Sequence, residues 1–482
     1  MEIEIDFDED SQFKNKINYV FNFILSNLEF KKDALSITYG NEVNKKDDLQ
    51  IHLYRTDQIF SPNNYLYNKP NLDVDKRLNI KEIDELDEDN FTKKTLPVLF
   101  KGVKNGEVLK INNRYIELNI DIITSIFFML TRYEEYIADQ DQLDNHDRFP
   151  TKKSIAYKEG FLDRPIVDEY VELLRQLINC LGIDCKWRNP WKDANFTACL
   201  THDVDSVKRF NSIRQVGQRI IKDMSLIVTY RAIKRYFESR MDYKKDPVWT
   251  FDYIMETENK YDFNSSFYFM ATHNKDDYGS DYNLSSHKIK KLLKKIEKNN
   301  NEIGIHPGYN TFNDAGKFKK QVDKLKNILN NKIFGGRQHY LKFDIKETLD
   351  LYEKNNLLYD STLYFAHQAG FRCGTSHPFK VYSLTQDREL DLWEIPLIVM
   401  DRTLKSEKYM NLEPEKALAY TRKLIDKIKK YNGVFTLLWH NSNFTDKWED
   451  WKYVYEEILK YIYKEDGKGM SGKEIIEALE EN

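Results

Sequence analysis

Cysteines and secretory features are both scarce in this chain of 482 residues. Its four cysteines form no CxxC pair and are too few to cross-link a protein of this length. The first residues, from Met1 to Asp6, lack the basic and apolar regions of a secretory signal. We therefore expect a location in the reducing cytoplasm.

Long apolar runs and an excess of one charge are also missing. No stretch reaches the ~18 apolar residues that a membrane span requires. The net charge of -4 arises from 74 basic and 78 acidic residues that are mixed along the chain. We therefore expect no nucleic acid or anionic membrane as partner. The lysines between 288 and 298 accompany Leu292, Leu293 and Ile296 in a helical pattern, which indicates a solvated helix face.

Repeats and a phosphate-binding loop are absent as well. No sequence repeat with a period of ~20 to 50 residues is evident. The stretch from Gly467 to Lys473 approaches the phosphate-loop pattern, but Glu474 stands where Ser or Thr would hold magnesium. No apolar strand precedes this stretch, so we expect a flexible turn before the last helix.

What is present is the composition of a globular protein, with 41% hydrophobic and 32% charged residues. A single barrel occupies only ~250 residues, so we expect at least two domains. Asn189-Pro190-Trp191-Lys192 supplies a break between them. It divides the chain into residues 1–190 and residues 195–482.

The first unit mixes strand and helix patterns, which indicates an α+β domain. Predicted strands are residues 3–7, 35–39, 50–53 and 96–100, and predicted helices are residues 17–28, 121–137 and 165–181. A polar cluster near the second long helix contains Arg132, Glu134, Glu135, Asp144, His146, Asp147 and Arg148. This cluster can line a pocket, but a domain contact or a set of salt bridges is at least as good an explanation. We assign it no chemistry.

The second unit alternates strand and helix patterns with regularity. Predicted strands are residues 196–201, 265–270, 302–305, 333–336, 357–360, 392–399 and 433–439. Helical patterns between them cover residues 249–261, 288–298, 317–329, 345–353 and 414–431. Strands separated by helices in this way favour a parallel, barrel-like α/β domain.

The first strand of the second unit ends in two carboxylates. Phe196 to Thr201 is followed directly by His202, Asp203, Val204 and Asp205. In an extended chain Asp203 and Asp205 point to the same side. Two acids that close together need a cation or a shared proton. The stretch is equally consistent with a simpler role, in which one aspartate caps the next helix.

Titratable residues recur at the ends of the other predicted strands. They are His306, Arg337, His339, Asp360, Asp391, Glu394 and His440. A lone histidine at a strand end is usually structural, but several strand ends that converge on one rim are how barrel enzymes build a site. We therefore predict an active site at this rim.

Five ordered motifs in residues 195–445 resemble those of the polysaccharide deacetylases, the NodB-homology carbohydrate esterases of family 4. They are THDVD at 201–205, GIHPGYN at 304–310, GRQHY at 336–340, DLWE at 391–394 and LWH at 438–440. The first unit resembles an uncharacterised domain found ahead of such deacetylases in bacterial surface-glycan proteins. The resemblance implies a distorted (β/α)7 barrel that removes N- or O-acetyl groups with a divalent metal, zinc in the first instance.

The resemblance also implies catalytic roles for three residues. Asp203 would deprotonate the attacking water, Arg337 would orient Asp203, and His440 would protonate the leaving group. A base on one side and an acid on the other complete an acyl transfer. A metal with an open coordination position makes hydroxide available near neutral pH.

The implied metal site consists of Asp205, His306 and Asn310. Asn310 stands where the family usually has a second histidine, four residues after the first. An amide oxygen is a poorer zinc ligand than imidazole, which predicts weaker binding or a harder ion. His339, where the family commonly has proline, is an alternative source of the third ligand.

These patterns predict a metal-dependent hydrolase that removes an acetyl group from a sugar or glycan intermediate of bacterial surface polysaccharide metabolism. The main alternative is a catalytically inactive barrel that binds a glycan or a protein partner, with Asn310 as a mark of lost metal affinity. Another metal-assisted hydrolysis is a third possibility, because a fold does not fix a reaction. The patterns do not specify the sugar or the oligomeric state.

Overall fold

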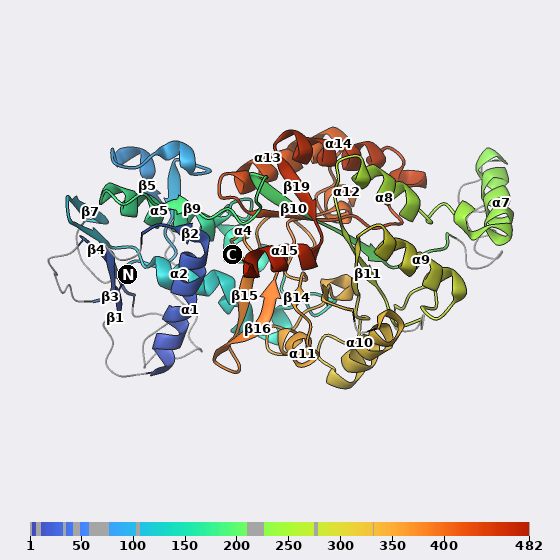
Figure 1. Cartoon of the computed structure of the whole chain (residues 1–482), viewed down its shortest axis with the longest axis horizontal. Helices are drawn as coiled ribbons and strands as arrows, with labels where there is room; N and C mark the ends of the chain where they lie inside the picture. The colour runs from blue at the N-terminus through green and yellow to red at the C-terminus, as the bar shows by residue number, and fades with distance from the viewer. Residues whose placement is uncertain are drawn as a thin grey trace.

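The structure is a computed structural model in which residues 2–5, 11–31, 35–41, 49–56, 77–102, 107–209, 226–273, 278–330 and 332–481 are described. Its two main sheets lie side by side along the long axis of the molecule (Figure 1). The smaller sheet uses strands from the first 118 residues, and the larger one uses strands from residue 196 onward. No helix among the described residues is long and apolar enough to cross a bilayer.

The smaller sheet has five strands in the order β1-β3-β4-β8-β7. They are β1 (Glu2–Ile5), β3 (Leu35–Gly40), β4 (Leu49–Tyr54), β8 (Tyr115–Leu118) and β7 (Leu109–Asn112), and only β7 runs antiparallel to its neighbour. The first three strands were predicted, although residues 6 and 7 of the first prediction lie outside the described residues. The predicted strand 96–100 belongs instead to a separate pair, β5 (Arg77–Asn79) with β6 (Thr95–Pro97).

The α-helices described in this first part are α1 (Ser11–Asn27), α2 (Ile122–Leu130), α3 (Tyr133–Tyr136), α4 (Ile155–Lys158) and α5 (Ile166–Cys180). The prediction of one helix over 121–137 was wrong, because the chain breaks between α2 and α3. Asp121 caps the start of α2 by accepting a hydrogen bond from the Thr124 N–H. Arg132 then adopts a left-handed conformation with φ 51°, which turns the chain and ends the helix.

The larger sheet has ten strands in the order β15-β16-β14-β13-β12-β11-β10-β18-β17, with β19 also paired to β10. All pairs are parallel except β15 with β16. Among the described residues it forms a curled half-barrel. The strands are β10 (Phe196–Val204), β11 (Ser266–Phe269), β12 (Glu302–Ile305), β13 (Gly335–Gly336), β14 (Tyr359–Asp360), β15 (Phe379–Ser383), β16 (Arg388–Glu394), β17 (Val399–Met400), β18 (Val434–Leu438) and β19 (Gly467–Met470).

Helices cover the outside of this sheet (Figure 1). They are α8 (Phe251–Asn259), α9 (His287–Lys298), α10 (Ala315–Leu329), α11 (Thr348–Lys354), α13 (Pro414–Lys429) and α14 (Trp451–Lys464), while α7 (Leu226–Met241) stands apart at the right of Figure 1. The last helix, α15 (Gly472–Glu480), contacts both β10 and β14, and its Ile475 and Ile476 belong to a buried cluster with Tyr268 and Tyr359. In α9 the apolar residues Ile289, Leu292 and Ile296 are buried and most of the lysines are exposed, which confirms the predicted solvated face.

Two segments of the larger sheet differ from the predictions. The predicted strand 392–399 divides into β16 and β17, which lie near opposite ends of the sheet order. Pro396 has no N–H to donate to a neighbouring strand. Residues 395–398 instead run from β14 to β18. The Ile395 N–H donates to the carbonyl oxygen of Asp360 at 2.9 Å, and the Ile398 N–H donates to that of Thr436 at 3.1 Å. The expected flexible turn at 467–473 is wrong, because β19 pairs with β10 there and Ser471 caps α15.

The first part of the chain packs against the larger sheet through buried polar contacts. Arg372 Nε donates a hydrogen bond to Glu135 Oε1 at 3.0 Å, and Arg132 Nε donates to the same oxygen at 2.8 Å. Asp168 of α5 accepts hydrogen bonds from the N–H and hydroxyl of Ser376 at 2.9 and 2.7 Å. The contact explanation for the polar cluster therefore holds for part of it.

Candidate metal centre and active site

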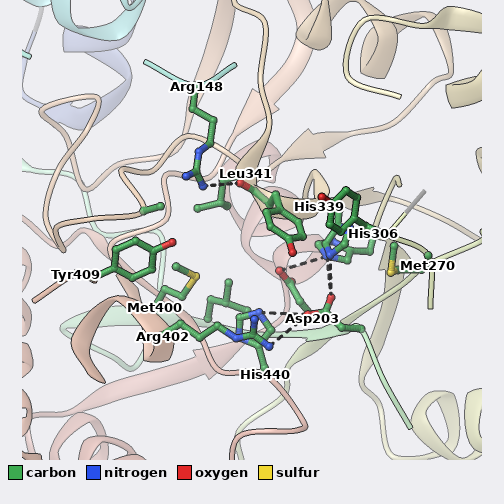
Figure 2. A pocket seen from close by; sticks show the side chains of 16 residues that line it. Arg148, Asp203, Met270, His306, His339, Leu341, Met400, Arg402, Tyr409 and His440 are labelled. Atoms are coloured by element: carbon green, nitrogen blue, oxygen red, sulfur yellow. Dashed lines mark hydrogen bonds and ion pairs between the residues drawn. The ribbon is translucent and has the colours of Figure 1, made fainter. Parts of the chain in front are cut away.

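A cavity of about 350 Å³ opens where the strands of the larger sheet end. Its walls include Asp203 at the end of β10, His306 after β12, His339 after β13 and His440 after β18 (Figure 2). Asp205 follows β10 and lines the same cavity. Residues far apart in the sequence thus meet at one rim, because parallel strands place their carboxyl ends at the same edge.

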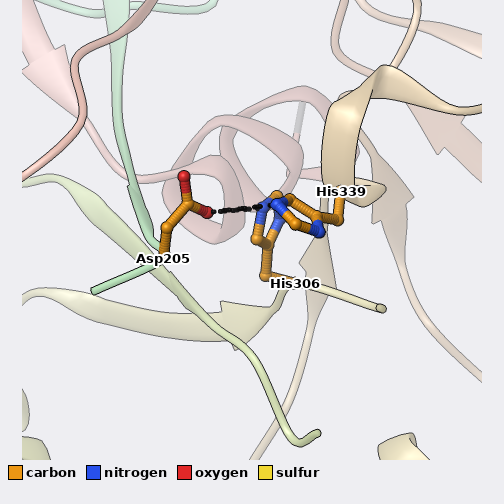
Figure 3. A group of neighbouring side chains, drawn as sticks. All are labelled: Asp205, His306 and His339. Carbon is orange, nitrogen blue, oxygen red and sulfur yellow. Dashed lines mark ion pairs between the residues drawn. The ribbon is translucent and has the colours of Figure 1, made fainter. Parts of the chain in front are cut away.

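Three of these side chains lie close enough to hold one metal ion (Figure 3). Potential ligand atoms of Asp205, His306 and His339 all lie within 4.8 Å of one another. Asp205 Oδ1 is 3.3 Å from His306 Nε2 and 3.7 Å from His339 Nε2. In a tetrahedral zinc site with bonds of ~2.1 Å, two ligand atoms are about 3.4 Å apart. The spacing therefore suits a zinc-sized ion.

The donor atoms are also oriented for such an ion. His306 Nδ1 lies 2.6 Å from the carbonyl oxygen of Arg337, so this nitrogen carries the proton and Nε2 offers its lone pair to the cavity. Asp205 Oδ1 and His339 Nδ1 are buried and have no hydrogen-bond partner among the described residues. Buried polar atoms without partners are rare, and a cation would satisfy the Asp205 oxygen. These residues fit a divalent metal.

The charges around Asp205 favour its ionised form. Burial alone would raise the pKa of this carboxyl, but the nearby imidazoles of His306, His339 and His440 hold the pKa well below its usual range. Burial lowers the pKa of His339 to about 4, despite the nearby Asp205. His339 is therefore neutral near pH 7, which is the form that binds a metal. Burial would lower the pKa of His306, but the negative charges of Asp203 and Asp205 outweigh burial and raise this pKa.

Asp203 is held beside this group by Arg337. The guanidinium Nη1 lies 3.1 Å from Asp203 Oδ1 and 2.9 Å from the hydroxyl oxygen of Thr201. Arg337 is fully buried, and its Nε donates to the carbonyl oxygen of Ser361 at 2.7 Å. Asp203 Oδ2 faces His306 Nε2 at 3.8 Å. This carboxylate is therefore fixed in direction and adjacent to the candidate metal position.

His440 is held in turn by Asp401, a residue that was not predicted from the sequence. Asp401 Oδ1 lies 2.8 Å from His440 Nδ1, and Oδ2 accepts hydrogen bonds from the backbone of His440 and the amide of Asn443, each at 2.8 Å. Burial would raise the pKa of Asp401, but His440 lowers it below its usual value. The ring therefore presents Nε2 toward the cavity, 3.8 Å from Asp205 Oδ2. The one available signal was an aspartate directly after the apolar run 395–400.

Several predicted rim residues do not line the cavity. Asn310 is half-buried and absent from its walls, so its role as a ligand stays a prediction. His202 lies between the backbone of Trp439 and the carboxylate of Glu258, at 2.7 and 2.8 Å, and is structural. The side chain of Asp391 is 89% exposed and pairs with a lysine.

Asp360 and Glu394 form a separate buried carboxyl pair. Neither residue lines the cavity. Burial raises the pKa of both, and Glu394 is shifted well above its usual value by burial and by the charge of Asp360. Both shifts favour the protonated form of the carboxyl, as expected for two buried acids side by side. The pair braces β14 against β16 and has no part in the rim.

Two arginines at the cavity were not predicted as site residues. Arg402 Nη2 lies 3.7 Å from Asp205 Oδ2, and its side chain is 48% exposed. Arg148 reaches the cavity from the first part of the chain (Figure 2). The pocket explanation for the polar cluster thus holds for Arg148. The exposed ring of Tyr278 also lines the cavity.

The comparisons with known proteins are sparse. Residues 7–182 match a family of unknown function, DUF7033. No curated protein matches the sequence with significance.

Three solved structures resemble the chain in part. A putative polysaccharide deacetylase from Mycobacterium smegmatis has 15% identity and a TM-score of 0.41, over 61% of this chain and 93% of its own. Puue allantoinase has 10% identity and a TM-score of 0.41, over 62% and 95%. A mutant CE4 family pseudoenzyme with restored enzymatic activity has 13% identity and a TM-score of 0.30, over 58% and 67%.

Proposed function

We propose that this protein is a metal-dependent hydrolase that removes an acetyl group from a sugar or glycan. The observation that carries the proposal is the assembly of three potential ligands, Asp205, His306 and His339, beside two separately positioned proton-transfer groups, Asp203 and His440. This arrangement has the parts that hydrolytic acyl transfer needs. The curled α/β sheet is consistent with the distorted (β/α)7 barrel of the polysaccharide deacetylases.

The ligand set that we propose is Asp205, His306 and His339, with Asn310 as the sequence-based alternative for the third place. One carboxylate oxygen and two imidazole nitrogens suit zinc and leave a coordination position open. When bound, such an ion supplies Lewis acidity and lowers the pKa of a water molecule in the site. Asp203 does not need to be a ligand, because Arg337 already holds one of its oxygens.

The protein's own groups then divide the proton transfers. Asp203 accepts the proton of the attacking water, whose oxygen forms a bond to the acetyl carbonyl carbon. As the bond from that carbon to the sugar nitrogen or oxygen breaks, His440 Nε2 donates a proton to the leaving atom. Asp401 keeps the proton of Nδ1 in place and thereby directs Nε2 toward the cavity. The products are acetate and the deacetylated sugar.

Replacement of Asp203 by Asn tests the proposal. Asp203→Asn removes the base but keeps the shape of the side chain, so acetate release from a panel of N- and O-acetylated sugars should fall by about 100-fold or more. Metal content, measured by elemental analysis, should stay at the wild-type level. Asp391→Asn is the matched control, because that aspartate is exposed, and it should change neither quantity.

A different result distinguishes the inactive-barrel alternative. Under that alternative, glycan affinity measured by calorimetry persists after chelation, and no sugar in the panel releases acetate. Wild-type protein that binds no zinc, cobalt or nickel in excess would overturn the proposed enzyme.

A further inference from the structure

The loop that carries His339 has an unusual backbone. Tyr340 has φ 62° and ψ 10°, and Leu341 has φ 54°, so two consecutive residues with side chains are left-handed. Such residues adopt this conformation only rarely. They keep it where the surroundings fix the backbone.

Residues 144–148, here called the 144–148 segment, hold part of this loop in place. They belong to the region matched by the family of unknown function. Arg148 Nη1 donates a hydrogen bond to the carbonyl oxygen of Tyr340 at 2.9 Å. Just beyond the loop, Lys342 Nζ pairs with Asp147 Oδ2 at 2.9 Å. The His146 ring packs against the Tyr340 ring, with centroids 5.1 Å apart. The 144–148 segment therefore contacts Tyr340, the first of the two left-handed residues, and Lys342, the residue that follows the second.

The 144–148 segment is held together by hydrogen bonds to one carboxylate, that of Asp144. Asp144 Oδ2 pairs with Arg148 Nε and Nη2 at 2.9 and 2.8 Å. Its Oδ1 accepts the backbone N–H groups of His146 and Arg148 at 2.8 and 3.0 Å. The Arg148 side chain is only 11% exposed. Because Asp144 fixes the guanidinium, the bond to Tyr340 O is made at little further cost in side-chain freedom.

His339 differs from the other two histidines of the site in how it is oriented. His306 Nδ1 is held by a carbonyl oxygen and His440 Nδ1 by Asp401. His339 Nδ1 has no hydrogen-bond partner among the described residues. Its ring is placed by its backbone and by contacts with the rings of Tyr340 and His306, with centroids at 4.7 and 5.0 Å. The position of Nε2 therefore depends on the loop.

From these contacts we infer that Arg148 is a positioning residue for metal binding, which acts through the loop 339–341 on His339. The inference rests on the proposed function and extends it. It gives the first part of the chain a defined task at the site, because that part sets the affinity of the centre without contributing a ligand. Partners of ligands outside the coordination sphere change metal affinity by about 10- to 100-fold.

A double-mutant cycle tests the inference. The dissociation constants for Zn²⁺ and Co²⁺ are measured for the full chain as wild type, Arg148→Ala, His339→Ala and the double variant. Arg148→Ala should weaken binding about 10-fold and change the visible spectrum of bound Co²⁺. In the His339→Ala background the same substitution should have no further effect, since the residue through which it acts is gone.

The controls separate this effect from a general loss of structure. Arg388→Ala is matched, because Arg388 also joins a carboxylate, Glu353, to a backbone carbonyl, that of Glu389, but does not line the cavity. It should leave metal affinity unchanged. Asp144→Asn, which releases Arg148 without removing it, is the second variant if Arg148→Ala does not fold, and should weaken binding in the same direction.

Each other outcome has a defined meaning. Equal weakening in both backgrounds, or none in either, overturns the role of Arg148 while the metal centre stands. Wild-type protein without measurable metal affinity overturns the proposed function, and this inference with it.

Discussion

Two residues, His339 and Asn310, are candidates for the third place in the metal centre. His339 has a nitrogen 3.7 Å from Asp205 Oδ1, and Asn310 does not line the cavity. We predict that His339→Ala weakens Zn²⁺ binding more than about 10-fold, because a direct ligand is lost, and that Asn310→Ala changes it less than about 3-fold. Competition with a chromophoric chelator measures both. The reverse order would assign the third place to Asn310.

At the scale of single residues, much of the candidate site could be predicted from the sequence. Asp203, Asp205 and His306 follow predicted strands directly, so strand alternation and the shared rim bring them together. Asp401 and Arg402 were not predicted as site residues. They follow β17, and the single strand predicted over 392–399 did not separate β17 from β16. A pattern of apolar residues cannot show that four residues in the middle of a run cross between the two sides of a sheet.

Burial of one histidine between elements should give stability a dependence on pH. His377, just before β15, stacks on Trp187 of β9 (Lys186–Trp187), with ring centroids 5.2 Å apart and an interplanar angle of 4°. Burial lowers the pKa of His377 from 6.5 to about 4. A histidine with a lowered pKa in the folded state must lose its proton to fold. Its stabilising contribution is complete above pH ~6.5 and is lost as the pH falls toward ~4.

The replacement His377→Phe checks this dependence, because it keeps an aromatic ring against Trp187 but cannot titrate. The free energy of unfolding, from denaturant titrations, should fall for the wild type relative to the variant by up to about 3 kcal/mol between pH ~8 and ~4. Other titrating groups are common to both proteins and cancel in the difference. Parallel pH curves for the two proteins would contradict the prediction.

Among the secondary-structure elements, hydrophobic periodicity predicted those that have one apolar face. It failed where the contact of a single side chain determines where an element ends. The α9 helix was predicted within one residue, because its apolar residues recur at helical spacing. The break at Arg132 could not be predicted, since the guanidinium is drawn toward the carbonyl of Arg372, 240 residues later in the chain. The β19 strand is short and glycine-rich, and it forms because β10 offers an edge to it.

For the molecule as a whole, Glu135 joins the two parts of the chain. It accepts from Arg132 Nε at 2.8 Å and from Arg372 Nε at 3.0 Å, and all three side chains are buried. Burial would raise the pKa of Glu135, but the positive charges of Arg372 and Arg132 outweigh burial and lower this pKa. Glu135→Ala would leave the buried Arg372 without its carboxylate and Arg132 with Glu134 alone, so the free energy of unfolding should fall by about 3–5 kcal/mol.

Chemical denaturation with two probes, tryptophan fluorescence and circular dichroism, measures this loss. Glu353→Ala is the control, because its arginine partner is 47% exposed, and it should cost less than about 1 kcal/mol. Equal losses for the two variants would show that the buried triad does not join the parts energetically.

The position of β10 in the larger sheet also has a consequence for synthesis on the ribosome. This strand, which leads into Asp203 and Asp205, pairs with β18 and β19, whose residues lie between 434 and 470. A nascent chain that has exposed only its first 400 residues holds both aspartates but lacks the strands that complete β10 and the loop that bears His440. Contacts between such distant segments form late and slowly. The candidate site therefore cannot be completed until residues 434–470 have left the ribosome, and until then β10 keeps an open edge that other chains can reach.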